Sequence, residues 1–553
     1  MPKRWHIAVH DQSRSLQLER ALGVPTVVAG LLAARGLADP AAAKAFLSAT
    51  MSDLRDPETL PGITQAADRI VAAIRNGRSI VIYGDYDADG MSATAILIDC
   101  LQTSGATPQW YVPDRIDEGY GLNSEALDSL KKKGADLVIT VDCGIASVRE
   151  AAHARTIGLE LIVTDHHAMG SELPDADVLV HPRLPGTNYP FGELCGAGVA
   201  MKLAWAIATR MSGAKQVSPA LREMLLRATG LAALGTVADV VPLIDENRIL
   251  VKHGLDCLKN RGGEGIKHLL ELTSLAGKTQ LDSEDIAFRI APRLNAAGRL
   301  GQAAVGIELL ITSDKARAIH LAQWVHELNV QRDSIERSIL LAATKQAEER
   351  FQPETDAALV LADRGWHPGV VGIVAGRLAE RWHRPVVIVA MDEHQGRPGI
   401  GSIRSVPGFD VHAALMSCKH LLLSCGGHAA AAGLRVEDSN LESFRKAFCA
   451  AVDERLPAEL RRAQIMIDGE TTLAGLSLEA VGQIERLAPF GQANRRPLLC
   501  ATAVALAEPP RKIGVGQRHL SMTLVQHGTK MRGVAFGAAD WALHLPVPGQ
   551  PFN

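Results

Sequence analysis

The sequence predicts an α/β protein of several domains, and three observations carry that prediction. At 553 residues the chain is long enough for three or four domains of ~100–200 residues each. Between residues 66 and 167, short apolar runs alternate with segments of helical periodicity, an order typical of a parallel sheet. After about residue 463 the pattern changes to short strands, which predicts a small β domain at the end of the chain.

The parallel sheet is predicted from three repeated units. Its first strand is expected at Ser79–Tyr83, after a helical stretch that ends in the Asn76–Arg78 turn, and MSATAILIDCLQTSG follows as a helix. Two further units end at Gly144 and at His167. Because ligands bind at the carboxyl ends of the strands in such sheets, the polar residues that follow these strands are expected to converge.

Beyond the first sheet, the residues from Ser313 to Phe351 contain neither Pro nor Gly, which predicts one long helix. A second α/β pattern follows in AALVLADRG, GVVGIVAGRLAERW and PVVIVAM. The predicted organisation is an N-terminal helical segment at 1–60, a parallel-sheet domain at 61–310, a linker helix at 311–352, a second α/β domain at 353–462 and a β domain at 463–553. The last residues end where another strand could begin, so we expect this β domain to be truncated.

Composition restricts the class of protein. Apolar residues make up 47% and charged residues 22%, as in globular proteins and unlike disordered chains. The chain starts without a signal-peptide pattern and has no apolar run of ~18 residues, so we expect a cytoplasmic protein without a membrane segment. The eight cysteines form no C-x-x-C pair and are expected to be reduced. A net charge of −3 means that any basic surface must be local.

The turn after the first strand carries three carboxylates. Asp85, Asp87 and Asp89 alternate in GDYDADG, and their hard oxygen ligands suit Mg²⁺ or Mn²⁺. Taken alone, the motif could equally be a solvated loop or a helix N-cap, because Asp favours both. The metal interpretation is strengthened by similar residues elsewhere, namely Asp142, Asp165, His166, His167 and Asp239. Such a set can hold two metal ions ~3.5–4 Å apart and stabilise an in-line displacement at phosphorus.

The motifs GDYDADG, VDCG, TDHH and VADVVP occur in this order. They resemble the four motifs of the DHH phosphoesterase superfamily. Other segments resemble the RecJ family within it: YVPDRIDEGYGLN, FGELCGAGVAMKLAW, IAPRLNAAGRLG, GWHPGVVGIVAGRLAE, GSIRS and CGGHAAAAG. The resemblance implies a DHH domain, a DHHA1-type second domain and an OB-like β domain. It also implies a metal-dependent 5′→3′ exonuclease that hydrolyses single-stranded DNA to nucleoside 5′-monophosphates in recombination and DNA repair.

The same resemblance implies a role for each site residue. Two ions, Mn²⁺ or Mg²⁺, would be held by Asp87, Asp89, Asp142, His166 and Asp239, with Asp142 as the bridge. Asp85, Asp165 and His167 are expected to be catalytic: Asp85 as a further member of the pocket, Asp165 as a support for its neighbours, and His167 facing the scissile phosphate. The expected nucleophile is a hydroxide held by metal.

Six residues are candidates for binding DNA phosphates: Arg115, Arg293, Arg299, Ser402, Arg404 and His428. Arg forks and hydroxyl groups suit this task, and Ser402 with Arg404 is favoured for the 5′ end. For the arginines, ordinary salt bridges are an equally good interpretation. In GGHAAAAG the glycines could expose backbone N–H groups to a phosphate or form a tight turn, and the four alanines are expected in the core.

The C-terminal region supplies the expected local basic surface, because seven Arg and Lys residues between 495 and 532 face only Glu508. PFGQANRRP departs there from the family pattern, with Ala493 in place of a glycine and Arg495 in place of a proline. The expected partner is single-stranded DNA; the resemblance adds single-strand-binding protein and a RecQ-like helicase, and we expect a monomer. Two alternatives remain: a phosphoesterase acting on short oligonucleotides or nucleotides, and a non-catalytic replication scaffold.

Overall fold

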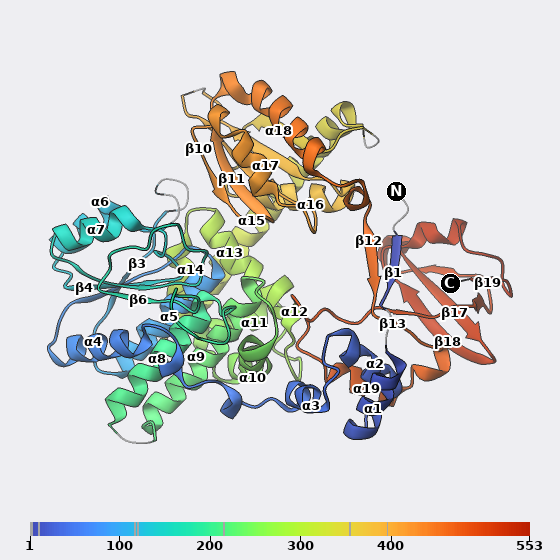
Figure 1. Cartoon of the computed structure of the whole chain (residues 1–553), viewed down its shortest axis with the longest axis horizontal. Helices are drawn as coiled ribbons and strands as arrows, with labels where there is room; N and C mark the ends of the chain where they lie inside the picture. The colour runs from blue at the N-terminus through green and yellow to red at the C-terminus, as the bar shows by residue number, and fades with distance from the viewer. Residues whose placement is uncertain are drawn as a thin grey trace. The chain divides into compact units, whose positions relative to one another are not determined.

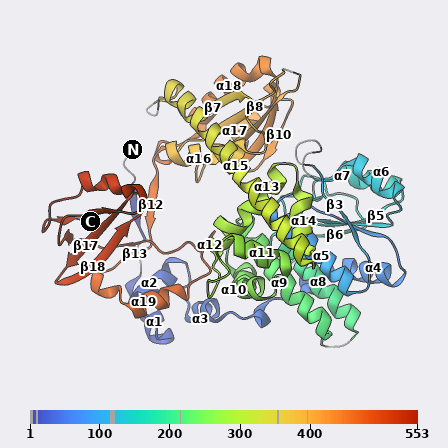
Figure 2. The same ribbon diagram turned by 180° about the vertical axis from the view of Figure 1, so that it is seen from behind.

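The computed structural model describes residues 4–8, 11–114, 118, 121–213, 216–352, 355–394 and 396–552 (Figures 1 and 2). The chain forms two compact units. The large unit comprises residues 50–462 and 491–493, and the terminal unit comprises residues 1–49, 463–490 and 494–553. The terminal unit thus combines the N-terminal segment with most of the C-terminal region, which the sequence patterns separate.

A five-stranded parallel sheet organises the first half of the large unit. Its strand order is β3-β2-β4-β5-β6, and every neighbouring pair is parallel. The strands are β2 (Ile80–Tyr83), β3 (Gln109–Tyr111), β4 (Leu137–Val141), β5 (Glu160–Thr164) and β6 (Val178–Val180). The second strand, β2, is fully buried, as expected for a strand covered on both faces. The polar residues that follow β2, β4 and β5 therefore meet at one edge of the sheet.

Helices cover both faces of this sheet (Figure 1). On one face, α6 (Ser124–Lys132) and α7 (Val148–Thr156) pack their apolar residues against Tyr83, Val138 and Val163. The other face carries α4 (Ile63–Arg75), α5 (Ala88–Thr103) and α8 (Gly196–Ser212). Both α5 and α8 are buried along almost their whole length. The first turns of both helices lie at the sheet edge where the polar residues meet, since Asp89 in α5 accepts from the first N–H groups of α8.

A helical block and one long helix follow. The block contains α9 (Pro219–Ala238), α10 (Asp245–Arg261), α11 (Gly263–Leu272), α12 (Ser283–Asp285), α13 (Ala291–Arg299) and α14 (Ala303–Ile311). The predicted long helix is present as α15 (Lys315–Arg350), whose first half packs on α11 and α13 and whose second half contacts α16 of the next domain. Asp314 caps its first turn by accepting from the Arg317 N–H, at 3.0 Å.

The second α/β part of the large unit has a mixed five-stranded sheet in the order β10-β11-β9-β8-β7. Its elements are β7 (Leu359–Arg364), α16 (Val371–Trp382), β8 (Val386–Met391), β9 (Gly399–Arg404), α17 (Val411–Ser417), β10 (Ser424–Gly427), β11 (Ala431–Val436) and α18 (Leu441–Arg455). SCGGHAAAAG forms the antiparallel β10–β11 hairpin. The expectation that all four alanines lie in the core is wrong, because Ala429 and Ala430 are exposed at its tip and only Ala432 is buried.

The terminal unit joins the two ends of the described chain. Strand β1 (Arg4–Ile7) pairs in parallel with β12 (Gln464–Ile467). Helices α1 (Gln12–Leu22), α2 (Thr26–Ala34) and α3 (Pro40–Ser48) share a core with Leu487 and Phe490. The remaining elements are β13 (Gly469–Glu470), α19 (Leu478–Glu485), β14 (Leu499–Cys500), β15 (Val504–Leu506), β16 (Arg511–Ile513), β17 (His519–Gln526), β18 (Thr529–Ala535) and β19 (Pro551–Phe552). The presence of α19 means that the residues after 463 are not purely β.

The predicted fold class is confirmed: two α/β parts linked by a long helix, and strands at the C-terminal end. All eight cysteines are free, and six of them are buried. Within the described residues no single helix is long and apolar enough to span a membrane; only α1 and α2, bent by 119° relative to each other, pass that test as a pair.

Candidate active site

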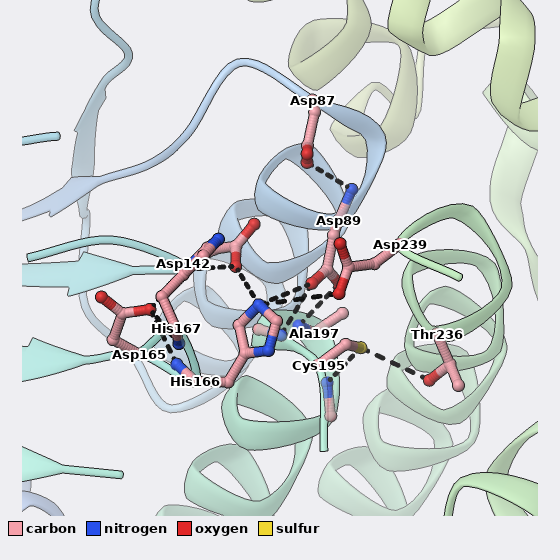
Figure 3. A network of polar contacts seen from close by, with 12 residues as sticks. Asp87, Asp89, Asp142, Asp165, His166, His167, Cys195, Ala197, Thr236 and Asp239 are labelled. Atoms are coloured by element: carbon pink, nitrogen blue, oxygen red, sulfur yellow. Dashed lines mark hydrogen bonds and ion pairs between the residues drawn. The ribbon is translucent and has the colours of Figure 1, made fainter. Parts of the chain in front are cut away.

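Carboxylates and histidines gather at the carboxyl edge of the parallel sheet (Figure 3). Asp85, Asp87 and Asp89 come from the turn between β2 and α5, and Asp142 directly follows β4. The DHH triplet, Asp165 to His167, follows β5, and Asp239 ends α9. The expected convergence of four separate segments is therefore present in the structure.

Asp89 connects two helix starts. It lies in the first turn of α5, where Asp87 is the N-cap and accepts from the Asp89 N–H at 2.9 Å. The Asp89 carboxylate in turn accepts from the first two N–H groups of α8, those of Gly196 at 2.7 Å and Ala197 at 2.9 Å. These backbone donors favour the negative charge, since helix N-termini attract anions. Asp89 is 1% exposed, so the surrounding atoms restrict its side chain to one position.

Asp142 is held in an unusual backbone conformation. Its φ of 63° lies in the left-handed region, which residues with a Cβ adopt uncommonly, although Asp is tolerated there better than most. Gly196 makes room for its side chain, because a Cβ at residue 196 would lie 2.5 Å from the Asp142 carboxylate. Asp142 is 2% exposed, so this strained carboxylate is buried in the centre of the group.

Asp165 and His167 form a hydrogen-bonded pair. The Asp165 Oδ1 accepts from the N–H groups of His166 and His167 and lies 2.8 Å from His167 Nδ1, and its Oδ2 accepts from Ile145 N–H. Burial opposes both ionised forms, yet the hydrogen bond and charge of the partner lower the Asp165 pKa to about 2 and raise the His167 pKa to about 9. Asp165 thus orients the DHH turn and keeps His167 protonated at neutral pH.

The pKa of His166 is lowered, in contrast to that of His167. Burial is the largest cause that lowers its pKa to about 3, with the His167 charge as a second cause, so the ring is neutral. Its Nε2 makes no hydrogen bond among the described residues. Instead it lies 3.1 Å from Asp142 Oδ1, 3.7 Å from Asp239 Oδ2 and 3.9 Å from Asp89 Oδ2. A neutral imidazole nitrogen among three carboxylate oxygens is the arrangement that a divalent cation requires.

The carboxylates repel one another. Burial and the nearby Asp87 charge raise the Asp89 pKa to about 6, and burial with the Asp89 charge raises the Asp239 pKa to about 8. The pKa of Asp142 is also raised well above its ordinary value, first by burial and then by the charges of its acidic neighbours. Protein side chains alone therefore leave excess negative charge in this site, and a bound cation would reverse these shifts.

The ligand atoms fall into overlapping groups. Asp85, Asp87 and Asp142 each offer one carboxylate oxygen, and these oxygens lie within 4.8 Å of one another. A carboxylate oxygen of Asp89, a ring nitrogen of His166 and a carboxylate oxygen of Asp239 lie equally close together. Asp142, His166 and His167 form a third such group, which links the first two. The residues present therefore fit two divalent metal ions, and Asp142 belongs to two of the three groups that would hold them. Asp85 joins the first group, in agreement with the expectation that it belongs to the pocket, but its role stays a prediction.

Two cavities open beside this cluster. One of about 270 Å³ is lined by Asp85, Asp87 and His167, together with Tyr86, Asn295 and Arg299. The second, of about 490 Å³, shares Tyr86 and Arg299 with the first and is lined further along by Ser402 and Arg404. Tyr86 and Arg299 thus line both the cavity beside the carboxylates and the cavity at the second α/β part of the large unit.

The phosphate-binding candidates occupy different places. Ser402 and Arg404 lie on the same face of β9, and Arg404 Nη1 donates to Ser402 Oγ at 2.9 Å. Gly372 at the start of α16 leaves room for both side chains, since a Cβ there would approach each within 3.0 Å. Arg299 reaches across to the second α/β part, where its Nη1 donates to the Gly369 carbonyl at 3.2 Å.

Three candidates lie elsewhere. His428 is at the exposed tip of the β10–β11 hairpin, where burial and then the Arg404 and His167 charges lower its pKa. Arg293 lines neither cavity, because it turns toward α15 and its Nε lies 3.2 Å from His326 Nδ1. Arg115 lies outside the described residues.

Sequence reasoning missed Tyr86 and Asn295. Tyr86 lines both cavities, and Asn295 accepts from the Ala88 N–H at 2.8 Å and so fixes the start of α5. Gly298 allows α13 to pack closely on the turn before α5, because a Cβ at residue 298 would lie 1.9 Å from the Tyr86 carbonyl oxygen. The available signal was the polar Asn within the apolar, small-residue run of RLNAAGR.

Comparisons with known proteins agree with this architecture. Residues 79–234 match the DHH family, N-terminal domain; residues 355–454 match the DHHA1 domain; and residues 467–551 match the RecJ OB domain. The single-stranded-DNA-specific exonuclease RecJ of Bacillus subtilis is 37% identical over 546 residues, which cover 99% of this chain and 67% of the relative. The chain belongs to the RecJ family.

Other members of the RecJ family support the assignment. The Escherichia coli RecJ exonuclease is 36% identical over 88% of this chain and 85% of its own length. Among solved structures, RecJ of Thermus thermophilus in complex with Mn²⁺ is 31% identical with a TM-score of 0.81, covering 96% of this chain and 78% of that one. The same protein has also been solved in complex with Mg²⁺. The predicted cofactor class is therefore confirmed for the family.

Proposed function

We propose that this chain is a metal-dependent exonuclease that degrades single-stranded DNA from its 5′ end and releases nucleoside 5′-monophosphates. The observation that carries the proposal is that Tyr86 and Arg299 line both the cavity beside the Asp/His cluster and the cavity that Ser402 and Arg404 line. Family membership supplies the substrate class, since the relatives are single-stranded-DNA-specific exonucleases.

The side chains divide the work of phosphodiester hydrolysis. Asp87 and Asp142 would hold one divalent ion, while Asp89, His166 and Asp239 would hold the other. When bound, such ions supply Lewis-acid stabilisation and lower the pKa of a coordinated water. His167 lines the cavity in protonated form, so it can donate a hydrogen bond to a phosphate oxygen while Asp165 holds its Nδ1 side.

The second cavity would set the 5′→3′ direction of degradation. Arg404 and Ser402 offer a fork and a hydroxyl group to a terminal phosphate, and Arg299 lies between them and the carboxylates. A strand anchored here by its 5′ phosphate would present its first phosphodiester to the Asp/His cluster. A strand that begins with its 3′ end lacks that terminal anchor, so it would bind more weakly.

The terminal unit offers a surface for the rest of the strand. Its β16–β18 region carries exposed Arg511, Lys512, Lys530 and Arg532, and Phe536 is 80% exposed just after β18. Basic groups bind the phosphate backbone, and exposed rings stack on unpaired bases, which duplex DNA does not offer. We further propose a cytoplasmic monomer that works with single-strand-binding protein and a RecQ-like helicase, on the basis of family membership alone.

The test uses uniformly labelled oligonucleotides, with either a 5′ phosphate or a 5′ hydroxyl group, in Mn²⁺. The expected result is release of mononucleotides from single strands, faster with the 5′ phosphate, and little degradation of blunt duplexes. Arg404→Ala should remove most of the preference for the 5′ phosphate and leave Mn²⁺ binding intact. Arg381→Ala, on the exposed side of α16 and paired with Glu348, is the matched control. Long products, equal activity on duplexes, or an unchanged preference in Arg404→Ala would contradict the proposal.

A further inference from the structure

One buried amide connects two loops beside the Asp/His cluster: the loop before α8, whose first N–H groups hold Asp89, and the loop that follows Asp239. Asn247, in the first turn of α10, is 0% exposed. Its Nδ2 donates to two backbone carbonyls, that of Glu193 at 2.5 Å and that of Pro242 at 3.0 Å. These carbonyls are 49 positions apart in the sequence but belong to loops that lead directly to and from the site.

The first loop sets the position of Asp89. Glu193 precedes Cys195, which is the N-cap of α8. The next two residues, Gly196 and Ala197, donate their N–H groups to the Asp89 carboxylate. A shift at Glu193 would therefore move the N-terminus of α8 and, with it, the oxygens of Asp89.

The second loop sets the position of Asp239. Val240, the residue after Asp239, has a φ of 59°, which is unfavourable for a β-branched residue. Its side chain is 65% exposed, so burial contributes little to stabilise this conformation. The loop is fixed just beyond this point, by Asn247 at Pro242 and by the Leu243 N–H, which donates to the Gln492 carbonyl at 2.8 Å. Without these contacts, the strained turn after Asp239 could relax.

We propose that Asn247 is a positioning residue that fixes the separation of Asp89 and Asp239, and thereby the metal affinity of the group they form with His166. This inference rests on the proposed function only in taking that group as a metal site. His166 Nε2 lies 3.7 Å from one carboxylate and 3.9 Å from the other, so a change in either loop alters the spacing of the three ligands. Supporting residues of this kind tune metal sites because ligand spacing decides affinity.

The chemistry requires an amide or another double donor at residue 247. Both N–H bonds are used on carbonyl oxygens, whereas Oδ1 is buried without a hydrogen bond to any described residue. An aspartate of the same shape would turn acceptor oxygens toward two carbonyls, and a serine could donate to only one of them. Alanine would leave both partly buried carbonyls without this donor, so we expect the two loops to shift.

The test is calorimetric titration of the metal-free full-length protein with Mn²⁺, without DNA. Wild type should bind two ions. Asn247→Ala should weaken one binding event by about 10- to 100-fold and leave the other, assigned to Asp85, Asp87 and Asp142, near its wild-type affinity. Asn247→Ser should lie between alanine and wild type because it retains one donor.

Gln526→Ala is the matched control for lost stability. Gln526 is also a buried amide that bridges two backbone groups, since it accepts from the Leu473 N–H at 2.7 Å and donates to the Thr502 carbonyl at 2.8 Å, but it lies in the terminal unit. It should lower the melting temperature without changing Mn²⁺ affinity. Unchanged Mn²⁺ binding in Asn247→Ala, or equal weakening of both events, would overturn the inference. A wild type that binds Mn²⁺ but does not cut single strands would contradict the proposed function instead.

Discussion

Gly235 in α9 is the position where adding one methyl group should disturb the site most directly. A Cβ at residue 235 would lie 2.2 Å from Asp89 Oδ1 and 2.6 Å from the Ala197 Cβ. An ordinary contact requires the Asp89 oxygen to move by about 1 Å, and errors of that size in a reacting group cost ~100-fold in rate. Gly235→Ala should therefore lower kcat/KM on single-stranded DNA by about 100-fold.

The effect on stability should be smaller than the effect on rate. Overpacking a buried site costs ~1–3 kcal/mol. Exchanging Gly for Ala inside a helix stabilises the folded state by ~0.5–1 kcal/mol, so the free energy of unfolding should fall by at most ~2.5 kcal/mol. Mn²⁺ affinity should fall together with activity, because Asp89 would also lose its alignment with the N–H groups of Gly196 and Ala197.

The assay compares initial rates on a 5′-phosphorylated single strand, Mn²⁺ titrations and thermal melting for Gly235→Ala and Gly482→Ala. Gly482 is an exposed glycine inside α19, and a Cβ there would meet no atom within 4 Å. Gly482→Ala should raise stability slightly and leave the rate unchanged. Wild-type activity and wild-type Mn²⁺ affinity in Gly235→Ala would refute the reasoning that this glycine leaves space for Asp89.

Three further perturbations test the charges of the site. Asp142→Asn should raise the melting temperature of the metal-free protein, because it removes a buried charge among acids. It should also lower activity by more than the ~100-fold that loss of a supporting residue costs. A lower melting temperature of the metal-free variant would contradict this reasoning. In EDTA, wild-type stability should fall as pH rises from about 4 to about 8, because the Asp89 and Asp239 pKa values of about 6 and about 8 exceed the ordinary 3.8. Saturating Mn²⁺ should remove this pH dependence. A stability that does not change with pH in EDTA would count against the raised pKa values. Asp165→Asn should lower the His167 pKa from about 9 and move the alkaline limb of the pH profile of kcat/KM to lower pH. An alkaline limb that does not move would show that activity does not need protonated His167.

The elements that meet at the site could be predicted because their local signals agree. The apolar run before GDYDADG becomes β2, and the helix that follows starts at Ala88 because Asp87 caps it. The convergence of Asp142, His166 and Asp239 then follows from the parallel order of the strands.

Other features depend on contacts between distant residues, which no local pattern contains. The left-handed backbone of Asp142 and the space above it need Gly196, 54 positions later. Arg293 resembles a phosphate ligand in sequence but faces α15, since its place on α13 was not readable from the motif. Ala429 and Ala430 are apolar yet lie at a hairpin tip, because they form the turn that the backbone hydrogen bonds between His428 and Ala431 close.

The parallel pairing of β1 with β12 has a consequence for synthesis of the chain. Ile7 pairs with Ile467, so the first strand must wait for about 460 further residues before its partner exists. At ~10 residues per second on the ribosome, this delay lasts roughly three-quarters of a minute. During that time the residues of the large unit from Thr50 to Arg462 emerge as a continuous stretch and can fold first. The nascent protein would then carry its Asp/His cluster before its β16–β18 surface exists, so the ability to bind metal should precede the ability to hold a long strand.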